Sequence, residues 1–302
     1  TLHNTLFPYT TLFRSAVLVA VAVAACAAGP AGGNELRLSS LAGSGLTVVD
    51  RDSGIDPYDF GRNPAWLYRD YEYDWIRFFF GGGEERGGLR RTFDPQSVTD
   101  LYSGFTGVKS LGERHVVSGK FTYQRLLDAG VERSLEIDQY NDPFYLTDFS
   151  TGGIEYYGPL TSVDYGLRIS DGLLLGAGFD YNICTGLKDQ YTRPQIIHNY
   201  FVGHFGLARV LSDTWVMGLV FRPVRIQNRT DFDKTDEGFD NVVRAYAGDG
   251  IYEVRAFSSY TIREILHGYE AAVQAFYDGG DLVAGINAGF SQSENEIEYG
   301  ST

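Results

Sequence analysis

The connectors between the patterned segments of this chain alternate between very short and very long, which limits the folds open to it. Long polar stretches such as residues 128–161 and 227–266 separate tight turns at 112–114, 170–172, 212–214 and 278–281. Segments of about ten residues with alternating apolar and polar side chains flank each turn, a combination typical of a membrane-spanning antiparallel β-barrel. The sequence therefore predicts an all-β fold, a transmembrane up-and-down β-barrel.

Residues 173–183 show the clearest alternation. Leu175 and Phe179 belong to an apolar face, whereas Asp180 and Asn182 belong to a polar face. Successive side chains of a strand point to opposite faces of the sheet, so the two faces meet different surroundings. The same period recurs in residues 117–123, 163–169, 201–211, 215–222, 269–277 and 282–290, and more weakly in 71–80 and 101–109. These segments predict about nine strands.

In a membrane barrel one face of the sheet meets lipid and the other meets the lumen. The polar side chains expected to face the lumen are Lys120, Asp164, Arg168, Asp180, Asn182, His204, Arg222, Glu270, Gln274 and Asn287. We expect these mixed charges to pair with one another and to hold a hydrated lumen or a plug. Aromatic girdles are expected at both membrane interfaces, formed by Tyr71, Tyr73, Trp75, Tyr123, Tyr181, Trp215, Tyr269, Tyr277 and Phe290.

The N-terminal residues predict export. Residues 5–15 read like the in-frame translation of a sequencing-library adapter, so residues 1–15 are set aside as an artefact. Residues 16–28 are uninterrupted Ala, Val, Leu and Cys, too short for a membrane helix of roughly 20 residues. Residues 16–33 are therefore expected to be a truncated signal peptide. Cys26 ends a Val-Ala-Ala-Cys run that resembles a lipoprotein processing box, so lipidation of Cys26 and ordinary cleavage both stay open.

Charge and motifs exclude several classes of function. The net charge of −14 at pH 7 argues against nucleic-acid binding, which needs a basic surface. Solvation explains the acidic connectors most simply; divalent-cation binding is the alternative, although the run beginning at Asp231 lacks the glycine and glutamate of a calcium loop. No motif supplies His204 with a nucleophile and an orienting group. We expect no enzymatic activity, no catalytic residues, no cofactor and no bound metal.

A short N-terminal stretch carries a family resemblance. Glycine-rich residues 42–50 are followed by Asn63-Pro64-Ala65, an arrangement that resembles the segment leading into long-chain fatty-acid-transporter-like barrels. Trp66 departs from that pattern, which usually has a small residue there. As a whole, residues 62–302 resemble more closely an uncharacterised Gram-negative outer-membrane barrel family, a domain of unknown function. The resemblance implies the fold and leaves the function open. Pro64 itself favours an extended Asn63 and a turn before the first strand.

These observations divide the chain into a periplasmic N-terminal segment at 34–69 and a partial barrel at 70–302 whose C-terminal strands are missing. Single-chain bacterial barrels have even strand numbers, short periplasmic turns and long extracellular loops. We expect a Gram-negative outer-membrane protein that contacts lipid and acts as a porin or channel for small or hydrophobic solutes. A structural, adhesin or secretion-accessory barrel with a surface or periplasmic protein partner is the alternative. An outer-membrane enzyme and a soluble lipoprotein sandwich are further alternatives.

Overall fold

The computed structural model describes residues 62–67, 74–88, 94–132, 146–190, 193–233, 242–246, 251–256, 259–279 and 282–301. Tyr71, Tyr73 and Cys26, together with the adapter-like residues and the expected signal peptide, lie outside these ranges. The described residues form strands and one short 3-10 turn, η1 (Pro64–Trp66). All described pairings between neighbouring strands are antiparallel. The prediction of an all-β antiparallel fold is confirmed.

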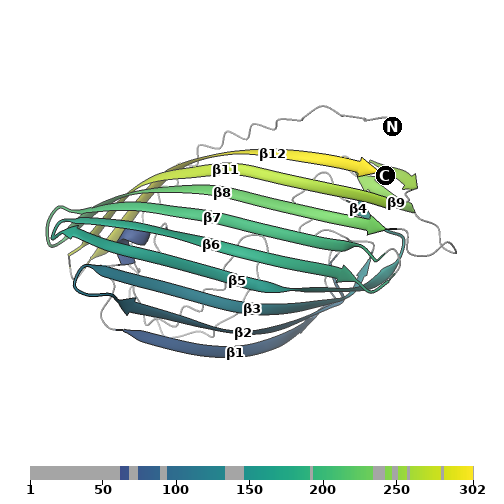
Figure 1. Cartoon of the computed structure of the whole chain (residues 1–302), viewed down its shortest axis with the longest axis horizontal. Coiled ribbons are helices and arrows are strands. Elements are labelled where there is room, and N and C mark those ends of the chain that lie inside the picture. The colour runs from purple at the N-terminus through teal and green to yellow at the C-terminus, as the bar shows by residue number, and fades with distance from the viewer. Residues whose placement is uncertain are drawn as a thin grey trace.

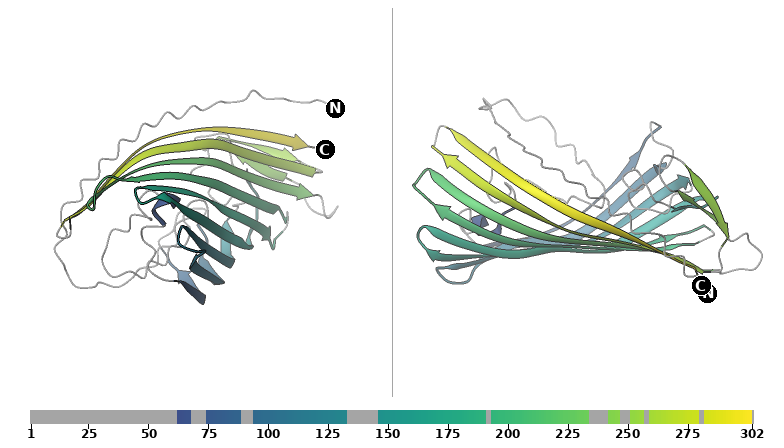
Figure 2. Two further views of the ribbon diagram at one scale, coloured as in Figure 1. Left: turned by 60° about the vertical axis from the view of Figure 1, so that its left-hand side comes forward. Right: turned by 90° about the horizontal axis from the view of Figure 1, so that it is seen from above.

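Nine strands form the main sheet, in the order β1-β2-β3-β5-β6-β7-β8-β11-β12 (Figure 1). They are β1 (Trp75–Arg86), β2 (Ser97–Ser110), β3 (His115–Glu132), β5 (Thr151–Ser170), β6 (Leu173–Lys188), β7 (Gln195–Val210), β8 (Trp215–Asp233), β11 (Ser259–Asp278) and β12 (Val283–Ser301). The order of these nine strands in the sheet is their order along the chain, so the topology is up-and-down. The sheet is strongly curved and twisted, and within the described residues it is open between β1 and β12 (Figure 2).

Tight turns join the strands at one end of the sheet, called here the turn end. Leu111 donates its backbone N–H to the carbonyl of His115 at 2.9 Å, and Leu211 does the same to Trp215 at 2.9 Å. Gly112 has a φ of 87°, a conformation that costs glycine little and other residues much more. These closures keep successive strands antiparallel and in a fixed register.

The strands extend further than the two-residue period indicates, which corrects the predicted long connectors. β3 continues to Glu132 and β5 begins at Thr151, well inside the stretch 128–161 expected to be a loop. Likewise β8 continues to Asp233 and β11 begins at Ser259. Backbone pairing continues there although the outward side chains become polar, so the alternation that marks the strands fades before the strands end.

A second, three-stranded sheet lies at the opposite end, called here the cap end. Its order is β10-β9-β4, and its strands are β4 (Leu146–Thr147), β9 (Val242–Tyr246) and β10 (Tyr252–Ala256). These three strands are the outer cap. A hydrophobic core joins the cap to the ends of β8 and β11, and it consists of Leu146, Phe232, Val243, Tyr260 and Ile262.

A buried ion pair lies beside the cap. Lys188, at the end of β6, donates from Nζ to both carboxylate oxygens of Asp148 at 2.8 Å, and the two side chains are 0% and 1% exposed. Lys188 also donates to the carbonyl of Ser150 at 3.0 Å. Since removing one partner would leave a buried uncompensated charge, this pair fixes the position of the chain directly after β4.

Candidate functional site

The two faces of the main sheet differ in the side chains that they expose and bury. On one face, called the outer face, large apolar side chains are exposed: Phe205 is 53% exposed and Leu219 is 50% exposed. The other, inner face buries polar side chains, such as Asp164 and Gln274, together with apolar ones, such as Phe276. A soluble protein buries its apolar residues and solvates its charges, and an exposed apolar surface of this extent marks contact with lipid or another apolar partner.

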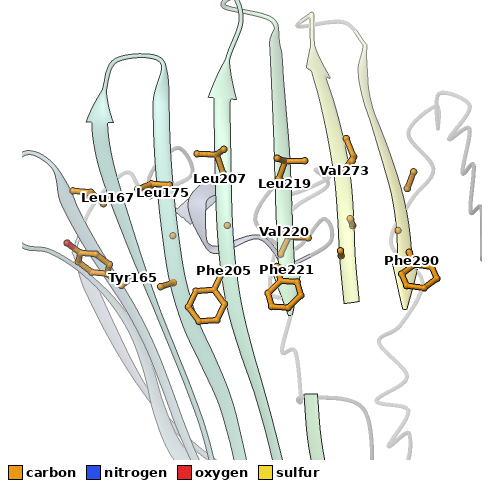
Figure 3. A pocket seen from close by; sticks show the side chains of 17 residues that line it. Tyr165, Leu167, Leu175, Phe205, Leu207, Leu219, Val220, Phe221, Val273 and Phe290 are labelled. Carbon is orange, nitrogen blue, oxygen red and sulfur yellow. The ribbon is translucent and has the colours of Figure 1, made fainter. Parts of the chain in front are cut away.

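The outer face also contains a wide apolar groove (Figure 3). It crosses β5, β6, β7, β8, β11 and β12 and has a volume of about 920 Å³. A row of leucines that includes Leu207 lines one long side of the groove, and a row of aromatic rings that includes Phe221 and Phe290 lines the other. Glycine and alanine line the space between the two rows. The groove therefore offers hydrocarbon contacts and almost no polar group.

Aromatic side chains form two rows on the outer face. At the turn end the rings of Trp215 and Tyr277 lie 5.0 Å apart. Nearer the cap, Tyr269 lies 6.0 Å from Phe221 and 6.1 Å from Phe290. Tyr269 and Tyr277 are eight residues apart on one strand, about 26 Å at about 3.3 Å per residue. Of the other expected girdle residues, exposure is 40% for Trp75, 45% for Tyr123 and 36% for Tyr181.

On the inner face, η1 lies against a track of glycines on three neighbouring strands. Gly176 on β6 is so close that a Cβ there would overlap the backbone nitrogen of Ala65. A Cβ at Gly206 on β7 would overlap Oδ1 of Asn63, and one at Gly218 on β8 would lie 2.9 Å from Nδ2 of Asn63. Only glycine admits the segment at the first two positions, because the nearest atoms belong to backbone or to a buried side chain.

Hydrogen bonds to Gln274 hold this segment in place. Asn63 donates from Nδ2 to Oε1 of Gln274 at 2.8 Å, and Trp66 donates from Nε1 to the same oxygen at 2.9 Å. Asn63 also accepts from the backbone nitrogen of Ala65 at 3.0 Å and caps η1. The ring of Trp66 packs edge-on against Phe276 with centroids 5.9 Å apart. We call Arg62 to Leu67 the inner plug, since these residues cover part of the inner face at the turn end.

A charged cluster lies next to the plug. His204 places Nδ1 at 3.4 Å from Oδ1 of Asp164 and Nε2 at 3.3 Å from Oδ2 of Asp180. Arg62 of the plug lies 3.5 Å from the same Oδ2 of Asp180. Gly178 stands between Asp164 and His204 in the register of three strands, and a Cβ there would overlap the Asp164 carboxylate. The missing side chain lets Asp164 reach across β6.

The remaining polar residues predicted for the lumen lie at several levels. Lys120 pairs in register with Ser162, and Ser162 with Asp180, so Lys120 is on the same row as the charged cluster. Arg222 and Glu270 form an ion pair at 2.5 Å. Arg168 lies at the turn end and donates to the carbonyl of Glu113 at 3.1 Å. The last two are Asn182, buried on β6, and Asn287, half-buried on β12.

Sequence reasoning misses the plug residues Asn63, Trp66 and Arg62 as site residues. The Asn-Pro-Ala motif predicts a turn before the first strand, whereas the structure places it against the inner face, far from β1 in the sheet order. Inner-face glycines on consecutive strands are the available signal, because they mark close approach of another backbone.

The described residues contain no group of three or more His, Cys, Asp or Glu that could hold a metal ion. In the same residues, no helix is long and apolar enough to cross a membrane.

Comparisons with known proteins give one family and one solved structure. The model of a family described as "Family of unknown function (DUF6850)" matches residues 64–302. No curated protein matches the chain. A solved structure described as "CymD monoaromatic hydrocarbon channel" is 10% identical in sequence, and the similarity covers 81% of this chain and 93% of that chain with a TM-score of 0.30.

Proposed function

This chain belongs to the DUF6850 family of unknown function, and we propose that it forms the wall of a channel in the Gram-negative outer membrane. The observation that carries the proposal is the inversion of the two faces, with apolar side chains exposed outside and charges buried inside. Acyl chains would cover the outer face, and the two aromatic rows would lie at the two interfaces. Transport, not catalysis, is the proposed role.

The proposal requires that the sheet be closed. Unpaired backbone groups at the edges of β1 and β12 would cost several kcal/mol each in a bilayer, so spanning sheets close into barrels. Both edges must therefore be paired in the membrane. The turn end then lies in the periplasm and the outer cap at the cell surface, as in barrels with short periplasmic turns.

The inner plug sets the state of the proposed channel. Arg62 to Leu67 cover part of the inner face at the turn end, and Gln274 and the glycine track hold them there. A small solute passes only when this segment shifts. The polar inner face supports water and small solutes, and we propose these, with apolar molecules that have a polar group, as the class transported.

Conductance of the full-length protein in planar lipid bilayers tests this function. Gly206→Ala puts a methyl group where Asn63 Oδ1 now lies, so the plug should be displaced and the conductance should rise. Gly119→Ala is the matched control, since a Cβ there meets no atom within 4 Å. A correctly inserted protein that carries no current in either variant would refute the channel.

An adhesive or structural role is the second candidate, and the outer cap favours it. Tyr252 of the cap and Phe149, two residues after β4, are each 47% exposed, and Arg244 lies over both rings, at 5.4 Å and 4.0 Å from their centroids. Exposed aromatic residues and arginine are enriched in protein interfaces. Capture of a surface or periplasmic protein by the wild type but not by Tyr252→Ser, together with absence of conductance, would select this role instead.

A further inference from the structure

A row of polar side chains crosses the inner face near the cap, away from the inner plug. His198 on β7 lies opposite Asn228 on β8, and Asn228 lies opposite Glu264 on β11. His198 Nδ1 is 2.5 Å from Oδ1 of Asn228, and Asn228 donates from Nδ2 to Glu264 Oε2 at 2.9 Å. Asn295 on β12 donates from Nδ2 to the other oxygen, Oε1, at 2.5 Å. The four residues form one continuous hydrogen-bonded row.

The carboxylate of Glu264 fixes the direction of every hydrogen bond in this row. An ionised carboxylate only accepts, so both amides turn their NH₂ groups toward it. Asn228 must then present its oxygen to His198, and His198 must carry its proton on Nδ1. In the neutral imidazole Nε2 is consequently a bare acceptor. A second proton on Nε2 would create a buried charge there without a hydrogen-bond acceptor.

Within the part of the chain that the structure describes, two acceptors in the row lack a donor. His198 is 2% exposed, and its Nε2 has no hydrogen-bond partner among the described residues. Oδ1 of Asn295 is also buried and unpaired in that part of the chain. A buried polar atom left without a partner costs about 1–3 kcal/mol, so such atoms are normally satisfied by water or by a ligand. Because both atoms only accept, the missing partner of each must be a hydrogen-bond donor.

Apolar side chains adjoin the row on its β6 side. Cys184 lies opposite His198 in the register and is 4% exposed, and Ile196 precedes His198 by one inner-face position. Both belong to a buried cluster that also contains Tyr156. A ligand that reaches Nε2 therefore meets hydrocarbon and sulfur on one side and an acceptor on the other.

The row lies outside the apolar band of the sheet. At this level the outer face has charged pairs: Arg229 with Asp231 at 2.8 Å and Arg263 with Glu298 at 3.4 Å. Charged side chains on a lipid-facing surface are unfavourable at the membrane centre and tolerated beyond the interface. A solute that comes from the cap end would thus meet this row before the charged cluster and the plug.

We propose that the row is a ligand subsite for neutral solutes in which a hydroxyl donor is attached to an apolar body, such as alcohols and phenols. The subsite rests on the proposed channel function and names the solutes that this channel admits. Nε2 of His198 accepts the solute hydroxyl, and the apolar cluster contacts its body. Asn228 and Glu264 act as positioning residues, since they hold the imidazole in the accepting tautomer.

Side-chain nitrogen NMR of the full chain, labelled with ¹⁵N-histidine and held in lipid nanodiscs, tests this subsite. Phenol is the probe and anisole, which has the same ring without a hydroxyl donor, is its matched control. We expect phenol to shift the Nε2 resonance of His198 at about tenfold lower concentration than anisole, the discrimination that one hydrogen bond provides. His198→Phe identifies the resonance, and His267→Phe, on the exposed face of β11, is the control variant.

The variant Glu264→Gln tests whether Glu264, through Asn228, holds the imidazole of His198 in its accepting tautomer, and it leaves the histidine in place. A glutamine can donate to Asn228, so the amide can turn and let the imidazole place its proton on Nε2. We expect the preference for phenol over anisole to be lost while the barrel still shows its heat-dependent gel mobility. The phenol preference of Glu264→Gln also tests the subsite if His198→Phe does not fold.

Three outcomes would overturn the subsite. Phenol and anisole could shift the resonance equally, benzylammonium could shift it more strongly than phenol, or no solute could shift it at all. The last result in a protein that conducts ions would leave the channel intact and assign the two acceptors to water. Loss of conductance together with an intact phenol response would instead refute the channel and retain the binding site.

Discussion

The inner and outer faces of β6, β7 and β8 share one backbone but use their side chains differently. On the inner face individual contacts are specific: Asn63 needs glycine at position 206, and Asp164 needs glycine at position 178. On the outer face Leu207, Leu219 and Val273 line one apolar groove, and what they share is their apolar character. The outer face therefore depends on the apolar character of its side chains, whereas the inner face depends on contacts between particular residues.

The largest expected effect comes from putting a charge on the outer face. Leu219→Arg should lower the free energy of unfolding in lipid by about 2–4 kcal/mol, the cost of arginine on the lipid side of a barrel near the membrane centre. Leu211→Arg, at a site 58% exposed in a turn, is the matched control and should change it little. Folded yield in lipid vesicles, read from the heat-dependent gel shift, measures both. Equal yields would show that lipid does not cover this face.

Next in size is the loss of a specific inner contact. Gln274→Leu removes the acceptor shared by Asn63 and Trp66. The buried indole N–H of Trp66 loses its acceptor, at a cost of about 1–3 kcal/mol, whereas Asn63 keeps a hydrogen bond to the carbonyl of Leu219 at 3.2 Å. The plug should loosen, and a cysteine at Ala65→Cys should react faster with a water-soluble maleimide. Gln292→Leu, which removes only an exposed acceptor for Tyr269 on the outer face, should leave that rate unchanged. A rate insensitive to Gln274→Leu would show that Gln274 does not hold the plug.

A smaller effect is expected where a glycine opens a path between two side chains. Gly178→Ala should push the Asp164 carboxylate away from His204 and reduce the unfolding free energy by about 1–2 kcal/mol. Urea unfolding in detergent micelles measures this change. The alanine should cost much less in an Asp164→Asn background, because the charged contact is already weakened there. Additive effects would show that Asp164 and His204 are not coupled through this gap.

The smallest effect concerns an aromatic pair on the outer face. Trp215 and Tyr277 have ring centroids 5.0 Å apart at the turn end, and such pairs contribute about 0.5–1.5 kcal/mol beyond burial. A double-mutant cycle with Trp215→Leu and Tyr277→Leu should yield a coupling energy of this size in lipid vesicles. A coupling near zero would leave both residues as independent interface anchors.

Sequence periodicity predicts the strands and their two faces wherever one face of the strand is apolar and the other is polar. Residues 173–183 alternate without interruption, and Leu175 and Asp180 lie on opposite faces of β6. The signal weakens toward the cap end, where the outer face becomes polar and buried apolar residues such as Ile196 and Phe232 lie on the inner face, so the predicted ends of β3 and β8 come too early. Hydrogen bonding between backbones continues there without leaving a pattern in the sequence.

The candidate sites depend on long-range register, which the sequence does not encode locally. Asn63 and Gln274 are separated by 211 positions and meet only because β11 lies beside β8 across the sheet. His198, Asn228 and Glu264 each have the parity of the inner face, but their alignment requires the lengths of two connectors to be known. Inner-face glycines also occur at bulges and turns, so they indicate a close approach without identifying the partner.

The outer cap has a consequence for how such a protein is made. Its strands come from two separate connectors, one between β3 and β5 and the other between β8 and β11. In a barrel inserted from the periplasm, both connectors must cross the bilayer as extended chain before Leu146 and Val243 can meet. Lys188 would travel beside them as an unpaired cation until Asp148 arrives. Biogenesis would therefore end at the cell surface, and a missing carboxylate at position 148 would stall a late intermediate whose strands are already in place.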